Sequence, residues 1–221
     1  MIADICAGCK AVLNGQSNDK TQAEKVEAAF PICACEAISV GLGSPGRVQD
    51  DELLYRMIIS PGDIDQSGNI LLEAFRDVRL DGLSVFRGSA SDDDVTALVV
   101  DRLTRRSPQQ KPKFVQALLC VEAKRLRDLK SDVLGRLFCV YDETVPRRVP
   151  GDPVVPTHVT VLQRLHPAKV DNRSGKIKED QKRLFDLIKT LRVDISDFRG
   201  GLINGLNARS DAGDFISEAA A

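Results

Sequence analysis

The stretch RLFCVYDE at residues 136–143 decides the class of fold that we predict for this chain. It is rich in β-branched and aromatic residues and is bounded by Gly135 and Pro146, which is typical of a core strand. The apolar run FVQALLCVEA at 114–123 fits either a strand or a helix, because its periodicity does not distinguish the two. Further strands are predicted in HVTVLQRL at 158–165 and in LDGLSVFRG at 80–88, whereas DDELLYRMII at 50–59 is a strand or a short helix.

Helical patterns lie between these runs. Ser91 precedes three aspartates at 92–94 and the apolar pattern VTALVVDRLTRR at 95–106, which predicts a capped helix whose dipole favours the acidic first turn. KEDQKRLFDLIKTL at 178–191 is amphipathic, and TQAEKVEAAF at 21–30 is a third candidate. We therefore expect an α/β or α+β protein with a mixed sheet, three to four helices and a small cysteine-containing segment at its N-terminus.

The chain has 221 residues, a formal charge of -1 and 43% hydrophobic residues. Such a chain buries enough surface for a core without disulfides, and its composition argues against a disordered protein or a polybasic binder of nucleic acids. Composition divides it into an N-terminal segment (1–46), a main domain (47–199) and a C-terminal tail (200–221), which we expect to be flexible because it is rich in glycine and polar residues.

No secretory signal or membrane span is predicted, since Asp4 interrupts the apolar start and no apolar run approaches the length of a bilayer. We therefore expect a cytoplasmic protein that keeps its six cysteines as thiols or metal ligands. Cys6 and Cys9 are three residues apart, and Cys33 and Cys35 are two apart in the predicted strand 32–40. Four convergent thiolates would suit tetrahedral zinc, although these small side chains could equally fill tight core space.

A possible catalytic motif follows the apolar run at 114–123. Glu122 and Lys124 form an ExK tripeptide, and Asp101 lies upstream of it. This tripeptide resembles the half-motif of restriction-endonuclease-like nucleases, in which carboxylates hold Mg²⁺ and the metal activates water at the scissile phosphate. The resemblance implies a Mg²⁺-dependent nuclease or phosphodiesterase, and the alternative is a solvated Glu–Lys pair.

Residues 102–130 concentrate positive charge in an otherwise neutral chain. Such a stretch indicates a surface for nucleic acid or for an acidic partner, although charge runs often only solvate a face. The patch residues that we select are Arg102, Arg105, Arg106, Lys111, Lys113, Arg125 and Arg127.

Conventional catalytic motifs are missing from the sequence. Neither histidine, His158 or His166, has a sequence motif that announces a nucleophile, and no P-loop, GxGxxG or GxSxG pattern is present. Arg56 and Ser84 could together grip a nucleotide pyrophosphate, as in ADP-ribosyl-transferring folds, or could simply be core-strand residues.

These observations favour a non-catalytic binding or accessory protein that acts through a protein partner, with zinc as a candidate stabiliser of its N-terminus. The alternatives are the Mg²⁺-dependent nuclease, with nucleic acid bound through residues 102–130, and a nucleotide- or NAD-handling transferase. No membrane association is expected.

Overall fold

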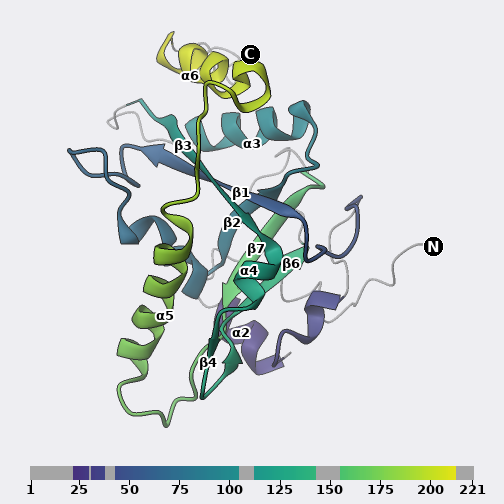
Figure 1. The fold of residues 1–221 in the computed structure, drawn as a ribbon, viewed down its shortest axis with the longest axis vertical. Coiled ribbons are helices and arrows are strands. Elements are labelled where there is room, and N and C mark those ends of the chain that lie inside the picture. Colours follow the sequence, from purple (N-terminus) through teal and green to yellow (C-terminus); the bar gives the residue numbers. More distant parts are fainter. Residues whose placement is uncertain (1–21, 30, 38–42, 105–111, 143–154, 213–221) are drawn as a thin grey trace.

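A computed structural model describes residues 22–29, 31–37, 43–104, 112–142 and 155–212. Six strands form one sheet in the order β6-β7-β2-β1-β3-β8, and every pairing within it is antiparallel (Figure 1). The strands are β1 Leu53–Ser60, β2 Leu83–Arg87, β3 Phe114–Glu122, β6 Phe138–Asp142, β7 His158–Gln163 and β8 Arg192–Val193. A separate two-stranded ribbon is formed by β4 Lys130–Ser131 and β5 Gly135–Arg136.

Helices cover both faces of this sheet. The described residues contain the α-helices α2 Gln22–Ala29, α3 Asp92–Thr104, α4 Ala123–Arg127, α5 Arg173–Ile188 and α6 Leu202–Ala212. They also contain the 3₁₀ segments η1 Ala34–Ala37, η2 Leu72–Arg79 and η3 Phe198–Gly201. Of the two predicted classes, α/β and α+β, the structure confirms α+β, with more helices than expected.

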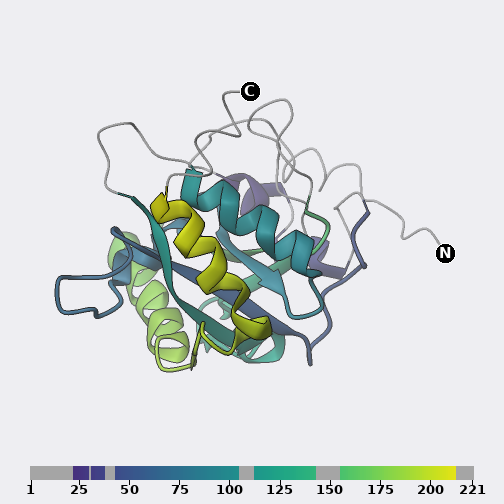
Figure 2. The same ribbon diagram turned by 90° about the horizontal axis from the view of Figure 1, so that it is seen from above.

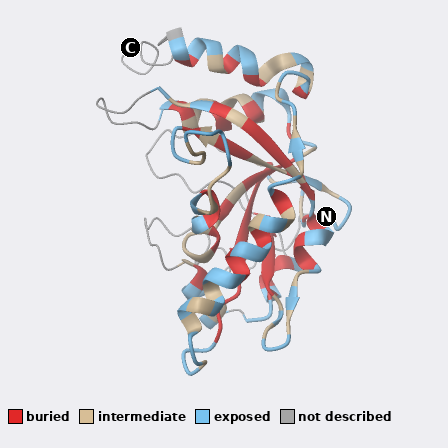
Figure 3. Cartoon of the chain, turned by 60° about the vertical axis from the view of Figure 1, so that its left-hand side comes forward, coloured by how far each residue is buried: buried red, intermediate tan, exposed pale blue. Residues whose placement is uncertain are grey.

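Alternation along the strands builds two main layers of core. Leu54 and Ile58 of β1 face the layer that packs beneath η2, α4 and α5, whereas Met57 and its neighbours face α3 and α6. Seen from above, α3 and α6 lie side by side on one face, and α5 lies on the other (Figure 2). Burial follows this division: the strands are mostly buried, and the helices expose their outward sides (Figure 3).

Several local predictions hold. Ser91 Oγ accepts a hydrogen bond from Asp94 N at 3.1 Å at the start of α3, as the capping pattern predicts. The strands predicted at 80–88, 136–143 and 158–165 form as β2, β6 and β7, and the amphipathic helix forms as α5. The two ambiguous runs, 50–59 and 114–123, are both strands, because β1 and β3 pair with each other in the centre of the sheet.

Two local predictions are wrong. The expected strand at 32–40 is the 3₁₀ segment η1 in its described part, with Ile32 and Cys33 in positive-φ conformations that no strand adopts. The tail that we expect to be flexible contains α6. Ile203 and Leu206 are buried against α3, and this burial stabilises a polar, glycine-containing helix.

Candidate functional site

The central strands β1 and β2 are hydrogen-bonded to each other at only one end. Only Leu54 and Tyr55 pair with β2, opposite Arg87 and Phe86, although β1 continues to Ser60. Beyond these pairs the two strands diverge and leave room between them. On the other side of β1, a register shift between Ile58 and Ile59 marks a bulge in the pairing with β3, and bulges often re-aim side chains beside functional sites.

The side chain of Arg56 occupies the place where the strands diverge. Its Nη1 donates to the Ser84 carbonyl at 3.0 Å, and its Nη2 donates to the Ala74 carbonyl of η2 at 3.0 Å. The guanidinium thus bonds the β2 backbone where a strand amide of β1 would otherwise lie. Its Nε is buried and has no hydrogen-bond partner.

Arg56 differs from three other arginines of the interior, Arg87, Arg127 and Arg164, in lacking a counter-ion. Arg87 binds Glu52 and Asp142, Arg127 binds Glu36 and Asp50, and Arg164 binds Glu27. Arg56, by contrast, has only carbonyl partners in the described part of the chain. Burial lowers the pKa of Arg56, and the more distant carboxylates of Asp63 and Asp77 oppose this effect. The guanidinium remains charged at neutral pH, so its charge is incompletely compensated.

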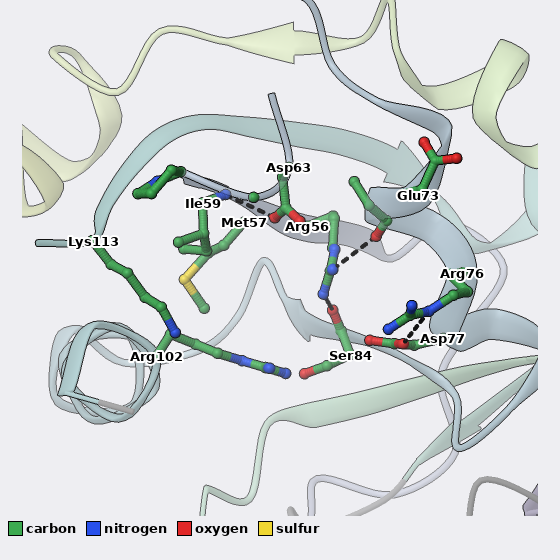
Figure 4. A pocket seen from close by; sticks show the side chains of 13 residues that line it. Arg56, Met57, Ile59, Asp63, Glu73, Arg76, Asp77, Ser84, Arg102 and Lys113 are labelled. Atoms are coloured by element: carbon green, nitrogen blue, oxygen red, sulfur yellow. Dashed lines mark hydrogen bonds and ion pairs between the residues drawn. The ribbon is translucent and has the colours of Figure 1, made fainter. Parts of the chain in front are cut away.

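A cavity of about 360 Å³ opens beside Arg56, which is within the range of small-molecule sites. Side chains from strands β1 and β2, from η2 and α3, and from the residue before β3 point into it (Figure 4). Four basic and three acidic side chains line it: Arg56, Arg76, Arg102, Lys113, Asp63, Glu73 and Asp77.

Two of the acidic side chains in the lining interact with neighbouring residues of the chain. Asp63 Oδ2 accepts a hydrogen bond from Ile59 N at 2.8 Å and thereby holds the loop after β1. Asp77 lies 3.9 Å from Arg76 Nε, and both side chains are about half exposed. On the opposite wall, Arg102 of α3 extends toward Ser84, and Lys113 reaches in beside it (Figure 4). Arg56, Arg102 and Lys113 therefore approach the cavity from different walls.

Ser84 also carries a hydroxyl that is paired with a histidine. Ser84 lines the cavity, and its Oγ lies 2.7 Å from Nε2 of His158 on the neighbouring strand β7. The ladder places Ser84 opposite Thr160 and Phe86 opposite His158, so the two residues are diagonal neighbours on one face of the sheet. His158 is 4% exposed. The sequence contains no local signal for this pair, because its members are separated by 74 positions.

The basic stretch does not form one continuous surface. Arg102 and Lys113 line the cavity, whereas Arg127 is buried and holds Glu36, Asp50 and the Val48 carbonyl. Arg125 is exposed on α4. The predicted patch is therefore wrong for Arg127, whose charge is used inside the protein. Three other members, Arg105, Arg106 and Lys111, lie outside the described residues.

The two residues of the ExK tripeptide are on the surface. Glu122 is the exposed last residue of β3, and the Lys124 ammonium lies 2.5 Å from Asp128 Oδ2 one turn along α4. Asp101 lies on α3, a helix and not the strand that the nuclease motif requires. Within the described ranges, no group of three histidine, cysteine or acidic side chains could hold a metal ion. The observed geometry thus lends no support to the nuclease alternative.

The described cysteines of the N-terminal segment are oxidised, and the expectation of thiols is wrong for them. Cys33 forms a disulfide with Cys139 of β6, and Cys35 is also disulfide-bonded. Cys139 is buried in the core as well as bonded. A four-thiolate zinc site would need Cys33 and Cys35 in reduced form; Cys6 and Cys9 lie outside the described residues.

Comparisons of the chain with models of protein families, with curated proteins and with solved structures found no match. None of the helices in the described ranges has the length and apolar character needed to cross a membrane.

Proposed function

We propose that the cavity between β1 and β2 binds a phosphate-bearing small molecule of the nucleotide class. One observation carries this proposal: Arg56 is a partly buried guanidinium that has no carboxylate partner and lies at the wall of a cavity. Leaving a charge uncompensated in the interior is costly, and an anionic ligand would supply the missing counter-charge.

The other cations favour phosphate over a single carboxylate. Arg102 and Lys113 approach the same space from a different wall, so cations from three segments line the cavity together with Arg76 and three carboxylates. A phosphate group presents several charged oxygens in different directions and can accept hydrogen bonds from all of them, and arginine is well suited to this recognition. The cavity volume of about 360 Å³ also leaves room for the rest of a small ligand.

This proposal develops the nucleotide-handling alternative of the sequence analysis, in which Arg56 and Ser84 grip a phosphate. Two residues of the predicted basic patch, Arg102 and Lys113, belong to this site. Action through a protein partner and a cytoplasmic location stay predictions, because no contact in the structure bears on either.

Isothermal titration of the full chain with inorganic phosphate, AMP, ADP and ATP tests the proposal. We expect saturable binding of at least one of them, weakened about 10-fold to 100-fold in Arg56→Met by the loss of a charged hydrogen-bond donor. Arg102→Met should weaken binding in the same direction without disturbing the two carbonyl contacts of Arg56.

The matched control is Arg183→Met on α5. Arg183 also donates to a backbone carbonyl and pairs with a carboxylate, but it lies outside the cavity lining. The Arg183→Met variant should bind these ligands as tightly as the unmodified chain does. Absence of binding by the folded chain, or equal binding by the Arg56, Arg102 and Arg183 variants, would disprove the proposal.

A further inference from the structure

We infer that Ser84 and His158 form a nucleophile and general-base pair that transfers a phosphoryl group from the ligand of this cavity. The inference rests on the proposed function and adds a reaction to it. Ser84 Oγ lies 2.7 Å from His158 Nε2 at the wall of a cavity that four cations and three carboxylates line.

The positions of the two residues suit these two roles. Ser84 lines the cavity and so presents its hydroxyl to a bound ligand, whereas His158 is buried and lies on the next strand. Backbone pairing keeps the strands in register, and a hydrogen bond from His158 N to the Val155 carbonyl at 3.1 Å holds the chain where β7 begins. A base fixed on a rigid strand within hydrogen-bond distance of a hydroxyl is the geometry that activates a serine.

The second histidine has a different environment. His166 Nε2 lies 2.8 Å from Asp180 Oδ2, and both residues are buried. No serine hydroxyl in the described part of the chain is hydrogen-bonded to the His166 ring. Only His158 is therefore placed to accept a proton from Ser84, and His166 provides a natural control.

The surrounding cations fit a phosphorus electrophile. Arg56 bonds the Ser84 carbonyl, and Arg102 extends toward the Ser84 side chain (Figure 4). A phosphate held by these cations would place its phosphorus near Oγ, with charge on the non-bridging oxygens offset by the guanidinium groups. Such electrostatic stabilisation is usually the largest contribution to catalysis of this kind.

His158 acts first as a base and then as an acid in the transfer. In the tautomer whose Nε2 is an acceptor, His158 takes the hydroxyl proton while Ser84 Oγ forms a bond to phosphorus. The bond from phosphorus to the leaving oxygen breaks, and this oxygen departs with the electron pair and receives the proton from His158. Water then attacks the phosphoserine with His158 again accepting a proton, and Oγ departs and is reprotonated, which releases phosphate.

A fluorophosphonate probe applied to the full chain tests the nucleophile. Ser84 Oγ should attack the probe's phosphorus and expel fluoride, giving one covalent adduct that peptide mapping places at Ser84. We expect no adduct at this position in Ser84→Ala and labelling at least about 100-fold slower in His158→Gln, as for the loss of a general base. His166→Gln should be labelled at the rate of the unmodified chain.

A second variant covers the case in which His158→Gln does not fold. In Ser84→Cys, the thiol introduced at position 84 should react with iodoacetamide faster than Cys120, which forms no disulfide and whose pKa is raised by burial. An equal or slower reaction at position 84 would overturn the role of His158. Absence of an adduct on Ser84 in the folded chain would overturn the whole inference.

Protection by ligand separates this inference from the proposed function. Inorganic phosphate should slow labelling of Ser84 in the unmodified chain and should not do so in Arg56→Met. Labelling without protection would support the serine–histidine pair and count against the anion site. Phosphate binding without labelling would leave the anion site standing and remove the reaction.

Discussion

Arg87 shows what a buried arginine of this protein requires. It is 2% exposed, and its Nη1 donates to both carboxylate oxygens of Glu52 at 2.9 Å. Its Nη2 donates to Asp142 Oδ1 at 2.9 Å and to the Gly46 carbonyl. Asp142 is completely buried and also accepts a hydrogen bond from Ser44. Arg56 has no such set of partners, and this contrast is the reason for assigning a ligand to it and not to Arg87.

The Arg87→Met substitution should lower the free energy of unfolding by about 3–5 kcal/mol, because it leaves the buried Asp142 carboxylate without its cation. Urea denaturation measures this change. Lys124→Met is the control: its ion pair with Asp128 is more than half exposed and should contribute no more than about 1 kcal/mol. Equal effects of the two substitutions would show that Asp142 is neutralised by other groups.

Tertiary contacts stabilise the helix α6 more than its own sequence does. Ile203 and Leu206 pack into the layer beneath α3, and the Asn207 side chain bonds the backbone of β3. Its Oδ1 accepts from Val115 N and its Nδ2 donates to Val115 O, each at 2.8 Å. The Asn207 amide thus satisfies the backbone N–H and carbonyl of Val115 as a neighbouring strand would. Val115 lies beyond the residues of β3 that pair with the short strand β8.

Asn207→Leu should lower the free energy of unfolding by about 1–3 kcal/mol, since it leaves one donor and one acceptor of Val115 without partners. Hydrogen exchange at the Val115 amide should become faster in the same variant. Asn204→Leu, at an exposed position of the same helix, should change neither quantity appreciably. Unchanged exchange at Val115 would mean that water replaces the side chain without cost.

The described part of the N-terminal segment is anchored to the edge of the sheet by both covalent and polar contacts. The Cys33–Cys139 disulfide joins positions 106 residues apart, and α2 and η1 pack over the β6–β7 end of the sheet. Glu36 is buried and accepts hydrogen bonds from Arg127 Nε at 3.1 Å and from Arg136 and Val140 N. These contacts tie the N-terminal segment to the main sheet.

The Cys33→Ser/Cys139→Ser double variant should lower the free energy of unfolding by about 2–5 kcal/mol, because a cross-link over so long a loop restricts the unfolded chain. Urea denaturation under non-reducing conditions measures it. Cys120→Ser is the control, since Cys120 forms no disulfide. A double variant as stable as this control would indicate that these two cysteines are not joined in the purified protein.

The sequence alone indicated most of the secondary structure and narrowed the class of fold to α/β or α+β. Ser91 and its three aspartates predicted the start of α3, and the runs at 136–143 and 158–165 predicted β6 and β7. These signals are local, because capping and periodicity report which side of an element is buried. They do not report which partner buries it, so the pairing of β1 with β3, the position of α6 and the oxidation of Cys33 could not be read from them.

The candidate site depended on tertiary structure to a greater degree. The sequence singled out Arg56 and Ser84 but could not connect either to His158, Arg102 or Lys113, which reach the same place from other elements. In the alternating run of β1, Arg56 stands where Leu54 and Ile58 predict a buried apolar face. Only the divergence of β1 from β2 turned this position into the wall of a cavity. The reason is physical: a counter-ion, a cavity or a hydrogen bond between distant residues exists only once packing has brought its members together.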